Sequence, residues 1–160
     1  HQIYFLQAGP YLSFIGLKDS EIGPAMTVGQ FSEIAIIAGL GLLLARLPFR
    51  IVLSLGALAY FVRYWIWSHP DWPISVLVAS QVLHGVCYAC FFATAYIYVD
   101  RSVPRDVRHS AQTVFGIVML GGGPVIGGQL SGYLAQRFAE PGVPGAEFAP
   151  LWSTLSWAGL

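Results

Sequence analysis

Residues 24–44 read PAMTVGQFSEIAIIAGLGLLL, and this apolar run indicates the class of protein. It is long enough for a helix that crosses a lipid bilayer, which takes ~20 mostly apolar residues. Glu33 is the one ionisable side chain in the run, and Gln30 lies three residues before it, on the same face of a helix. A charged group at bilayer depth costs roughly 3 kcal/mol even on the mildest scale, so it usually faces a cavity or a partner. The run therefore predicts a membrane helix that carries a polar site.

The composition of the whole chain is that of a membrane protein. Of its 160 residues, 56% are hydrophobic and only 10% are charged. A soluble domain carries about 25% charged residues, and one of this size has too much surface to hide such a deficit. The formal net charge of zero gives no indication of a nucleic-acid partner. We therefore expect an all-α, polytopic membrane helix bundle whose main surroundings are the lipid bilayer.

Six helical segments are predicted from the apolar runs and the polar turns between them. Four are full spans and two, at the ends of the chain, are partial: about 24–45, 49–67, 74–98 and 109–135, flanked by 1–17 and 149–160. Because the chain starts and stops inside apolar runs, we expect residues 1–160 to be a partial bundle cut from a longer protein.

The charges in the connections predict an orientation. The connections after 24–45 and 74–98 carry five arginines, whereas the other connections carry only Lys18 and Arg137. Short loops rich in Lys and Arg stay in the cytoplasm, so the arginine-rich side is predicted to be cytoplasmic. The opposite side carries three tryptophans that fit an interfacial aromatic belt, namely Trp65, Trp67 and Trp72.

Glu33 and His84 are predicted to lie at matched depths. At 1.5 Å per residue, they fall ~13 Å and ~15 Å from the outer ends of their spans, near the middle of a hydrocarbon core of ~30 Å. Secondary transporters place substrate and ion sites at this depth, so the pair predicts a transport site. The alternatives are a structural hydrogen bond from Glu33 to a neighbouring helix and a packed histidine bonded to a carbonyl.

Other polar side chains in the apolar segments have two interpretations each. Gln2 and Gln7 could bind a polar ligand or make polar contacts between helices. Tyr88 lies one helical turn after His84 and is the aromatic side chain that we expect to line a cavity. Arg63 lies one turn from the outer end of its span. It could extend to water or form a structural ion pair, and a direct role with an anionic group is the alternative.

The fifth helical segment, 109–135, is rich in glycine. Gly123 with Gly127, and Gly128 with Gly132, place small residues four apart, a spacing that lets helix backbones approach closely. Close helix packing is the preferred interpretation. A hinge at Gly123 and Pro124 is the secondary one.

No cofactor or metal is expected. Cys87 and Cys90 are the only cysteines, and they lie inside an apolar run. A zinc site needs more ligands than this pair provides, so small buried side chains are the simpler interpretation. An intramembrane enzyme would need a nucleophile with a base or a set of metal ligands. The chain contains no Gly-x-Ser-x-Gly and no His-Glu-x-x-His motif.

Several pieces of the chain together resemble the nucleoside:proton symporter family of the major facilitator superfamily. The resemblance covers roughly residues 4–132, and the pieces that carry it are 29–33 (GQFSE), 59–64 (AYFVRY), 84–92 (HGVCYACFF), 98–100 (YVD) and 110–132. It implies a twelve-helix transporter of the bacterial inner membrane that imports nucleosides with protons. The chain would be its C-terminal six-helix half, with the first and last helices truncated and the N-terminal half missing.

The same resemblance implies roles for individual residues. Gln30 and Glu33 would hydrogen-bond the nucleoside, and Glu33 is also the candidate for exchanging the coupled proton. His84 and Tyr88 fall on binding positions of the family's tenth helix. Gln2 corresponds to a glutamine of the seventh helix.

Two positions depart from the family pattern. Ala89 stands where members often carry an aspartate, and Phe5 stands where they have an asparagine. These departures keep a second function open, namely a major facilitator carrier for another small polar solute such as a sugar or a drug-like compound. A membrane sensor built on the same scaffold, without transport, is a third.

Overall fold

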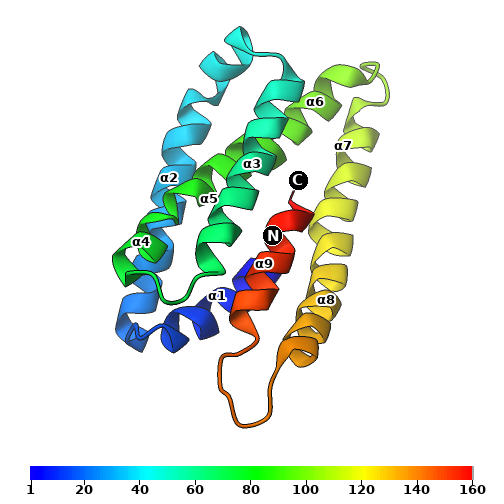
Figure 1. Ribbon diagram of the computed structural model, residues 1–160. Coiled ribbons are helices and arrows are strands. Elements are labelled where there is room, and N and C mark those ends of the chain that lie inside the picture. Colours follow the sequence, from blue (N-terminus) through cyan, green and yellow to red (C-terminus); the bar gives the residue numbers. More distant parts are fainter. Residues whose placement is uncertain (160) are drawn as a thin grey trace.

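The chain folds into a bundle of helices in a computed structural model that describes residues 1–159 (Figure 1). Within these residues no strand forms, apart from one isolated bridge between Glu140 and Val143. The helical segments are α1 (Gln2–Phe14), α2 (Asp19–Arg46), α3 (Phe49–Trp67), α4 (Ile74–Ala79), α5 (Val82–Cys87), the π-helical η1 (Tyr88–Ala93), α6 (Thr94–Ser102), α7 (Arg108–Gly116), the π-helical η2 (Ile117–Gly122), α8 (Gly123–Phe138) and α9 (Phe148–Ala158).

Four of the helices are long and apolar enough to cross a membrane. They are Asp19–Arg46, Phe49–Trp67, Ile74–Ser102 and Arg108–Phe138, in which consecutive segments join into one continuous helix. These four coincide with the four predicted full spans, so the chain is a multi-pass membrane protein. The two flanking segments form shorter helices, α1 and α9.

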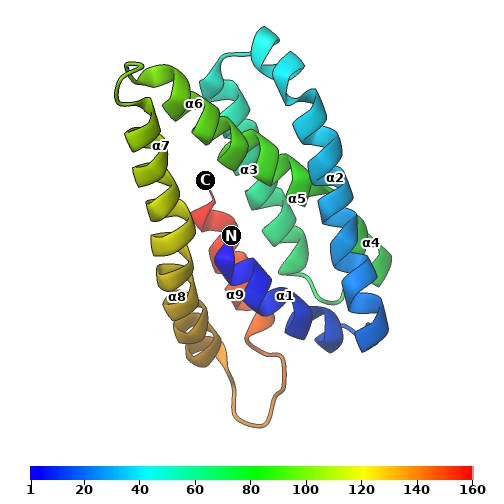
Figure 2. The same cartoon turned by 180° about the vertical axis from the view of Figure 1, so that it is seen from behind.

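The connections between the long helices lie at two opposite ends of the bundle. The turn from α2 to α3 and the turn from α6 to α7 share one end, and the connections from α3 to α4 and from α8 to α9 share the other (Figure 1). This is the alternation that the predicted topology requires, and it gathers the arginine-rich turns on one side. α1 lies between α2 and α8, as the reverse view shows (Figure 2).

One predicted member of the aromatic belt is instead part of the core. Trp67 is completely buried, its ring lies 4.9 Å from that of Trp152, and its indole N–H donates to Ser80 Oγ at 2.9 Å. The assignment of Trp67 to the membrane interface was therefore wrong. Trp65 and Trp72 are exposed, as a belt requires.

The helix Ile74–Ser102 changes its winding around the residues that resemble a binding site. The amide of His84 donates to the carbonyl of Gln81 at 2.9 Å, a tight i to i−3 bond. The following segment, η1, is π-helical, and Thr94 Oγ1 donates five residues back to Ala89 O at 2.9 Å. Tight turns and π-bulges inside a helix frequently occur at functional sites.

The glycine-rich face of α8 makes one close contact. A Cβ atom on Gly127 would lie 2.8 Å from Cβ of Gln2, so α1 and α8 approach closely there. A Cβ on Gly128 or Gly132 would meet nothing within 4 Å. The prediction of close helix packing at that pair is therefore wrong for the described residues. The π-helical η2 ends directly before Gly123 and Pro124, where the hinge is predicted.

Candidate functional site

The candidate site forms where α2 and α5 approach each other without intervening side chains. A Cβ on Gly29 would lie 3.1 Å from Cβ of His84, and a Cβ on Gly85 would overlap the backbone of Ser32 and Glu33. The hydroxyl of Ser32 donates across the contact to Val82 O at 2.6 Å. Because glycine leaves room for the facing backbone, the two helices hold Glu33 beside His84.

The two ionisable groups that were predicted to lie at matched depth, Glu33 and His84, lie next to each other in the structure. Glu33 Oε2 lies 3.8 Å from His84 Nε2. The side chain of Glu33 is 26% exposed and that of His84 only 4%, so the carboxylate lies on the open side of the pair. The carboxylate therefore faces accessible space beside the imidazole.

Three further side chains form a buried polar network behind His84. Arg63 Nη1 lies 3.0 Å from His84 Nδ1, and Arg63 Nη2 donates to Gln81 Oε1 at 2.6 Å. The hydroxyl of Tyr4 donates to the same oxygen at 3.2 Å, and the guanidinium lies 3.9 Å from the centre of the Tyr4 ring. Arg63 and Gln81 are both completely buried. The network joins α1, α3 and the start of α5.

The network corrects the interpretation of Arg63. Its side chain does not extend to water, because it is 0% exposed, and within residues 1–159 no carboxylate lies within 4.0 Å of it. Arg63 shares one face of α3 with Tyr60, Tyr64 and Trp67, all buried, and this spacing could have indicated that it points inward. Sequence reasoning also missed Gln81, although it lies three residues before His84 on the same helical face.

A cavity of about 290 Å³ opens between the start of α1, η1 and the helix Arg108–Phe138, and neither Glu33 nor His84 lines it. Gln2 and Tyr88 both line it, as the sequence predicted for polar and aromatic side chains of a binding cavity. His1 lines it too, and its ring stacks on that of His84 with centroids 5.2 Å apart. The ring of His1 therefore connects the cavity with His84, which does not itself line it.

The two remaining predicted site residues, Gln30 and Gln7, do not line this cavity either. Gln30 is exposed on α2, one turn before Glu33. Gln7 Nε2 donates to Ser131 Oγ at 2.9 Å and so makes the polar contact between α1 and α8 that was its alternative interpretation. The structure thus pairs Glu33 with His84 and places Gln2 and Tyr88 on the neighbouring cavity, whereas Gln7 belongs to neither.

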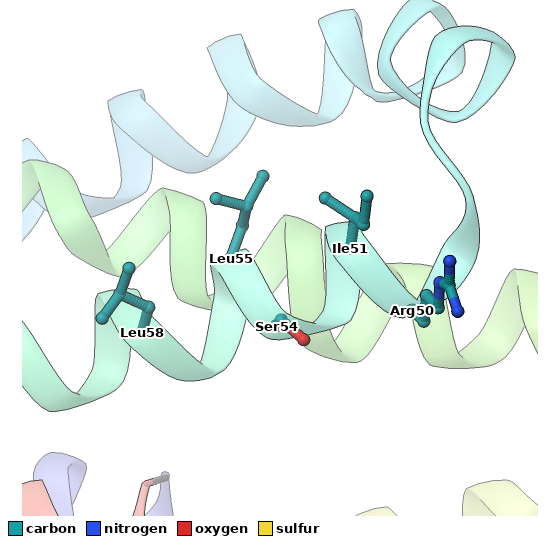
Figure 3. A pocket seen from close by; sticks show the side chains of 5 residues that line it. All are labelled: Arg50, Ile51, Ser54, Leu55 and Leu58. Carbon is teal, nitrogen blue, oxygen red and sulfur yellow. The ribbon is translucent and has the colours of Figure 1, made fainter.

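A second hollow lies on a different side of α3 and is not connected with the polar network. Five side chains along that side line a shallow groove of about 300 Å³: Arg50, Ile51, Ser54, Leu55 and Leu58 (Figure 3). The groove contains none of the predicted site residues. Its Arg50 is exposed, unlike Arg63 on the same helix.

The chemistry that the site offers is hydrogen bonding and ion pairing. Glu33 presents an acceptor and His84 a ring nitrogen, and Tyr88 contributes an aromatic side chain to the lining of the cavity. Within residues 1–159, no three side chains of His, Cys, Asp or Glu gather as a metal ion would require. Such a set recognises a polar ligand with an apolar or aromatic part.

Comparison with known proteins finds one family model and several relatives, and their descriptions agree with one another. The family model described as nucleoside H⁺ symporter matches residues 1–158. The YegT protein of Escherichia coli K12, described as a candidate nucleoside transporter, is 32% identical over 98% of this chain and 36% of its own length. The nucleoside permease NupG and the xanthosine permease of the same organism are each 25% identical, over 74% of this chain and 29% of theirs. The chain thus spans about a third of these relatives. No solved structure matches it significantly.

Proposed function

Because this chain belongs to the nucleoside H⁺ symporter family, we propose that it is part of a secondary transporter that carries nucleosides across the bacterial inner membrane together with protons. The family is one of transporters and not of enzymes. The observation that carries the proposal is the contact between Glu33 and His84, which lie on two helices that are each long enough to span the bilayer. A carboxylate held there has a functional partner and an accessible face, which is what intramembrane substrate and proton sites need.

In the proposed complex, each side chain of the site contacts a different part of the nucleoside. Glu33 accepts hydrogen bonds from N–H or O–H groups, and Gln30, on the same exposed face of α2, supplies both a donor and an acceptor. Tyr88 offers a ring on which a nucleobase stacks. Gln2 reaches the same cavity from α1.

The proposed mechanism is alternating access in a larger molecule. Residues 1–160 would form the C-terminal half of a major facilitator fold, and a second half of the longer protein would form the other wall of the site. The relatives are about three times as long as this chain, which supports that arrangement. Secondary transporters place their sites between two such halves, near the bilayer midplane. Glu33 would take up and release the coupled proton as the site changes sides.

Uptake of a labelled nucleoside by the full-length protein in proteoliposomes tests the proposal. Glu33→Gln removes the charge and keeps the shape, and we expect it to abolish the dependence of uptake on the proton gradient. The matched control is Glu140→Gln, on an exposed loop between α8 and α9, which should leave uptake unchanged. Wild-type uptake and wild-type proton dependence in Glu33→Gln would remove Glu33 from the mechanism.

Competition by unlabelled compounds separates the alternatives for the substrate. Inhibition by a panel of nucleosides, and not by sugars or drug-like cations, supports nucleoside transport. Inhibition by sugars or drug-like cations alone would indicate that the protein carries another small solute. No flux of any labelled solute would identify a sensor on a transporter scaffold.

A further inference from the structure

Arg63 is a buried cation whose hydrogen-bonding partners must all be acceptors. A guanidinium stays protonated and carries five N–H donors and no acceptor. Its Nη1 lies 3.0 Å from His84 Nδ1, inside the completely buried part of the network. The bond between them therefore runs from the Arg63 N–H to the lone pair of Nδ1.

This direction determines where the imidazole carries its proton. A histidine nitrogen that accepts a hydrogen bond bears no hydrogen, so the neutral ring must carry it on the other nitrogen. That nitrogen, Nε2, lies on the Glu33 side of the ring, 3.8 Å from Oε2. We propose that Arg63 is a positioning residue that holds His84 neutral, with an Nε2–H directed toward Glu33.

The guanidinium is itself held from two other helices. Gln81 Oε1 accepts from Arg63 Nη2 and from the hydroxyl of Tyr4, so the amide can only be oriented with its oxygen toward both donors. The ring of Tyr4 covers the guanidinium at 3.9 Å, a favourable contact between a cation and an aromatic face. Gln81 and Tyr4 therefore restrict the orientation of the Arg63 side chain. In that orientation its Nη1 lies 3.0 Å from Nδ1 of His84.

The arrangement places a donor and an acceptor side by side. The Nε2–H of His84 donates and the carboxylate of Glu33 accepts, with the two atoms 3.8 Å apart. A ligand with an acceptor next to a donor, such as the edge of a nucleobase or a pair of neighbouring hydroxyls on ribose, satisfies both. This last step rests on the proposed function, whereas the protonation pattern of the ring does not.

Nitrogen NMR of the full-length protein in lipid bilayers tests the protonation pattern directly. With ¹⁵N-labelled histidine and arginine, we expect His84 to show a bare Nδ1, a protonated Nε2 and a correlation between Nδ1 and a guanidinium nitrogen. The signal is assigned by its loss in His84→Gln. A ring protonated on Nδ1, or on both nitrogens, in the wild-type protein would overturn the inference, and this result needs no variant to fold.

A pair of arginine variants identifies the donor. Arg63→Met should abolish the correlation and allow the proton to redistribute between the two ring nitrogens. Arg50→Met, on the same helix but in the exposed groove of Figure 3, should preserve both features. Persistence of the correlation in Arg63→Met would show that another group bonds Nδ1 and would contradict the proposal.

Two substitutions at position 84 test the consequence for the ligand. Gln places an amide N–H₂ where Nε2–H lies, whereas Asn reaches only to the position of Nδ1. We expect His84→Gln to keep the nucleoside Kd within about threefold of wild type and His84→Asn to weaken it by about tenfold or more, the loss of roughly one hydrogen bond. Equal affinities of the two variants would refute a donor role for Nε2. If the wild-type protein carries no nucleoside while its Nδ1 accepts from Arg63, the proposed function fails and the inference about the ring stands.

Discussion

The close approach of α2 and α5 at Gly85 gives a steric test of the site. Replacing Gly85 by alanine adds one methyl group, and its Cβ would overlap the backbone of Ser32 and Glu33. Backbone atoms cannot rotate aside, so the helices must separate. We therefore expect Gly85→Ala to move Glu33 away from its position beside His84.

Two opposing effects determine how much Gly85→Ala changes the stability of the protein. Inserting a methyl group into a packed contact costs about 1–3 kcal/mol. Alanine in place of glycine favours a helix by about 1 kcal/mol. Gly39 provides a control on α2 itself, because a Cβ there would meet nothing within 4 Å. The two variants should thus differ in stability by about 1–3 kcal/mol, with Gly39→Ala equal to wild type or more stable.

The substitution should also weaken binding of the ligand. If the displaced carboxylate of Glu33 loses its hydrogen bond to the nucleoside, about 1.5–3 kcal/mol is lost, or roughly a 10- to 150-fold rise in Kd. Thermal unfolding of the purified full-length protein and nucleoside binding by calorimetry measure the two quantities. Equal stability and equal affinity of Gly85→Ala and Gly39→Ala would refute the reasoning, because the overlap would then have no consequence.

Two other substitutions separate binding from structure. Ser131→Ala removes the acceptor of Gln7 and should lower stability by about 0.6 kcal/mol, a typical value for a polar contact between membrane helices, with nucleoside affinity unchanged. A clear loss of affinity in a binding assay would return Gln7 to the site. Tyr88→Ala should weaken nucleoside binding by about 1–3 kcal/mol, roughly 5- to 150-fold, whereas Tyr88→Phe should keep most of it. Equal losses in both variants would show that the hydroxyl, and not the ring, makes the contact.

The spans could be predicted from the sequence because a bilayer requires a minimum apolar length. The ends of the helices depend on local bonds that hydropathy does not describe. α2 begins at Asp19, five residues before the predicted start at 24, and the backbone N–H of Lys18 donates to Glu21 Oε2 at 3.0 Å. Acidic side chains in a first turn stabilise the start of a helix, so the polar turn became helical.

The matched depth of Glu33 and His84 could also be predicted, because the rise per residue is constant and both spans enter from the same side. That the two side chains face each other depends on the close approach at Gly29 and Gly85. The environment of Arg63 could not be found that way, since depth measures position along a helix and not direction around it. Its neighbours on the inward face of α3, Tyr64 and Trp67, carried the missing information. Tertiary packing decides which partner lies opposite Arg63, and here it is Gln81.

Glycine spacing was an unreliable guide to close helix contacts. Gly128 and Gly132 have the expected separation but face open space in the described chain. The contact that builds the site uses Gly29 and Gly85, which lie on different helices and so have no spacing to recognise. Spacing along one helix describes only half of a contact, and the other half depends on which neighbour it meets.

A double-mutant cycle in nucleoside binding tests most directly that Glu33 and His84 act as one site. Calorimetry would give the Kd for the full-length wild type, for Glu33→Gln, for His84→Asn and for the double variant. Side chains that contact each other and one ligand should be coupled by about 1 kcal/mol or more, so the loss in the double variant should differ from the product of the single losses at least roughly fivefold. Agreement with that product within about twofold, as for independent positions, would contradict the account.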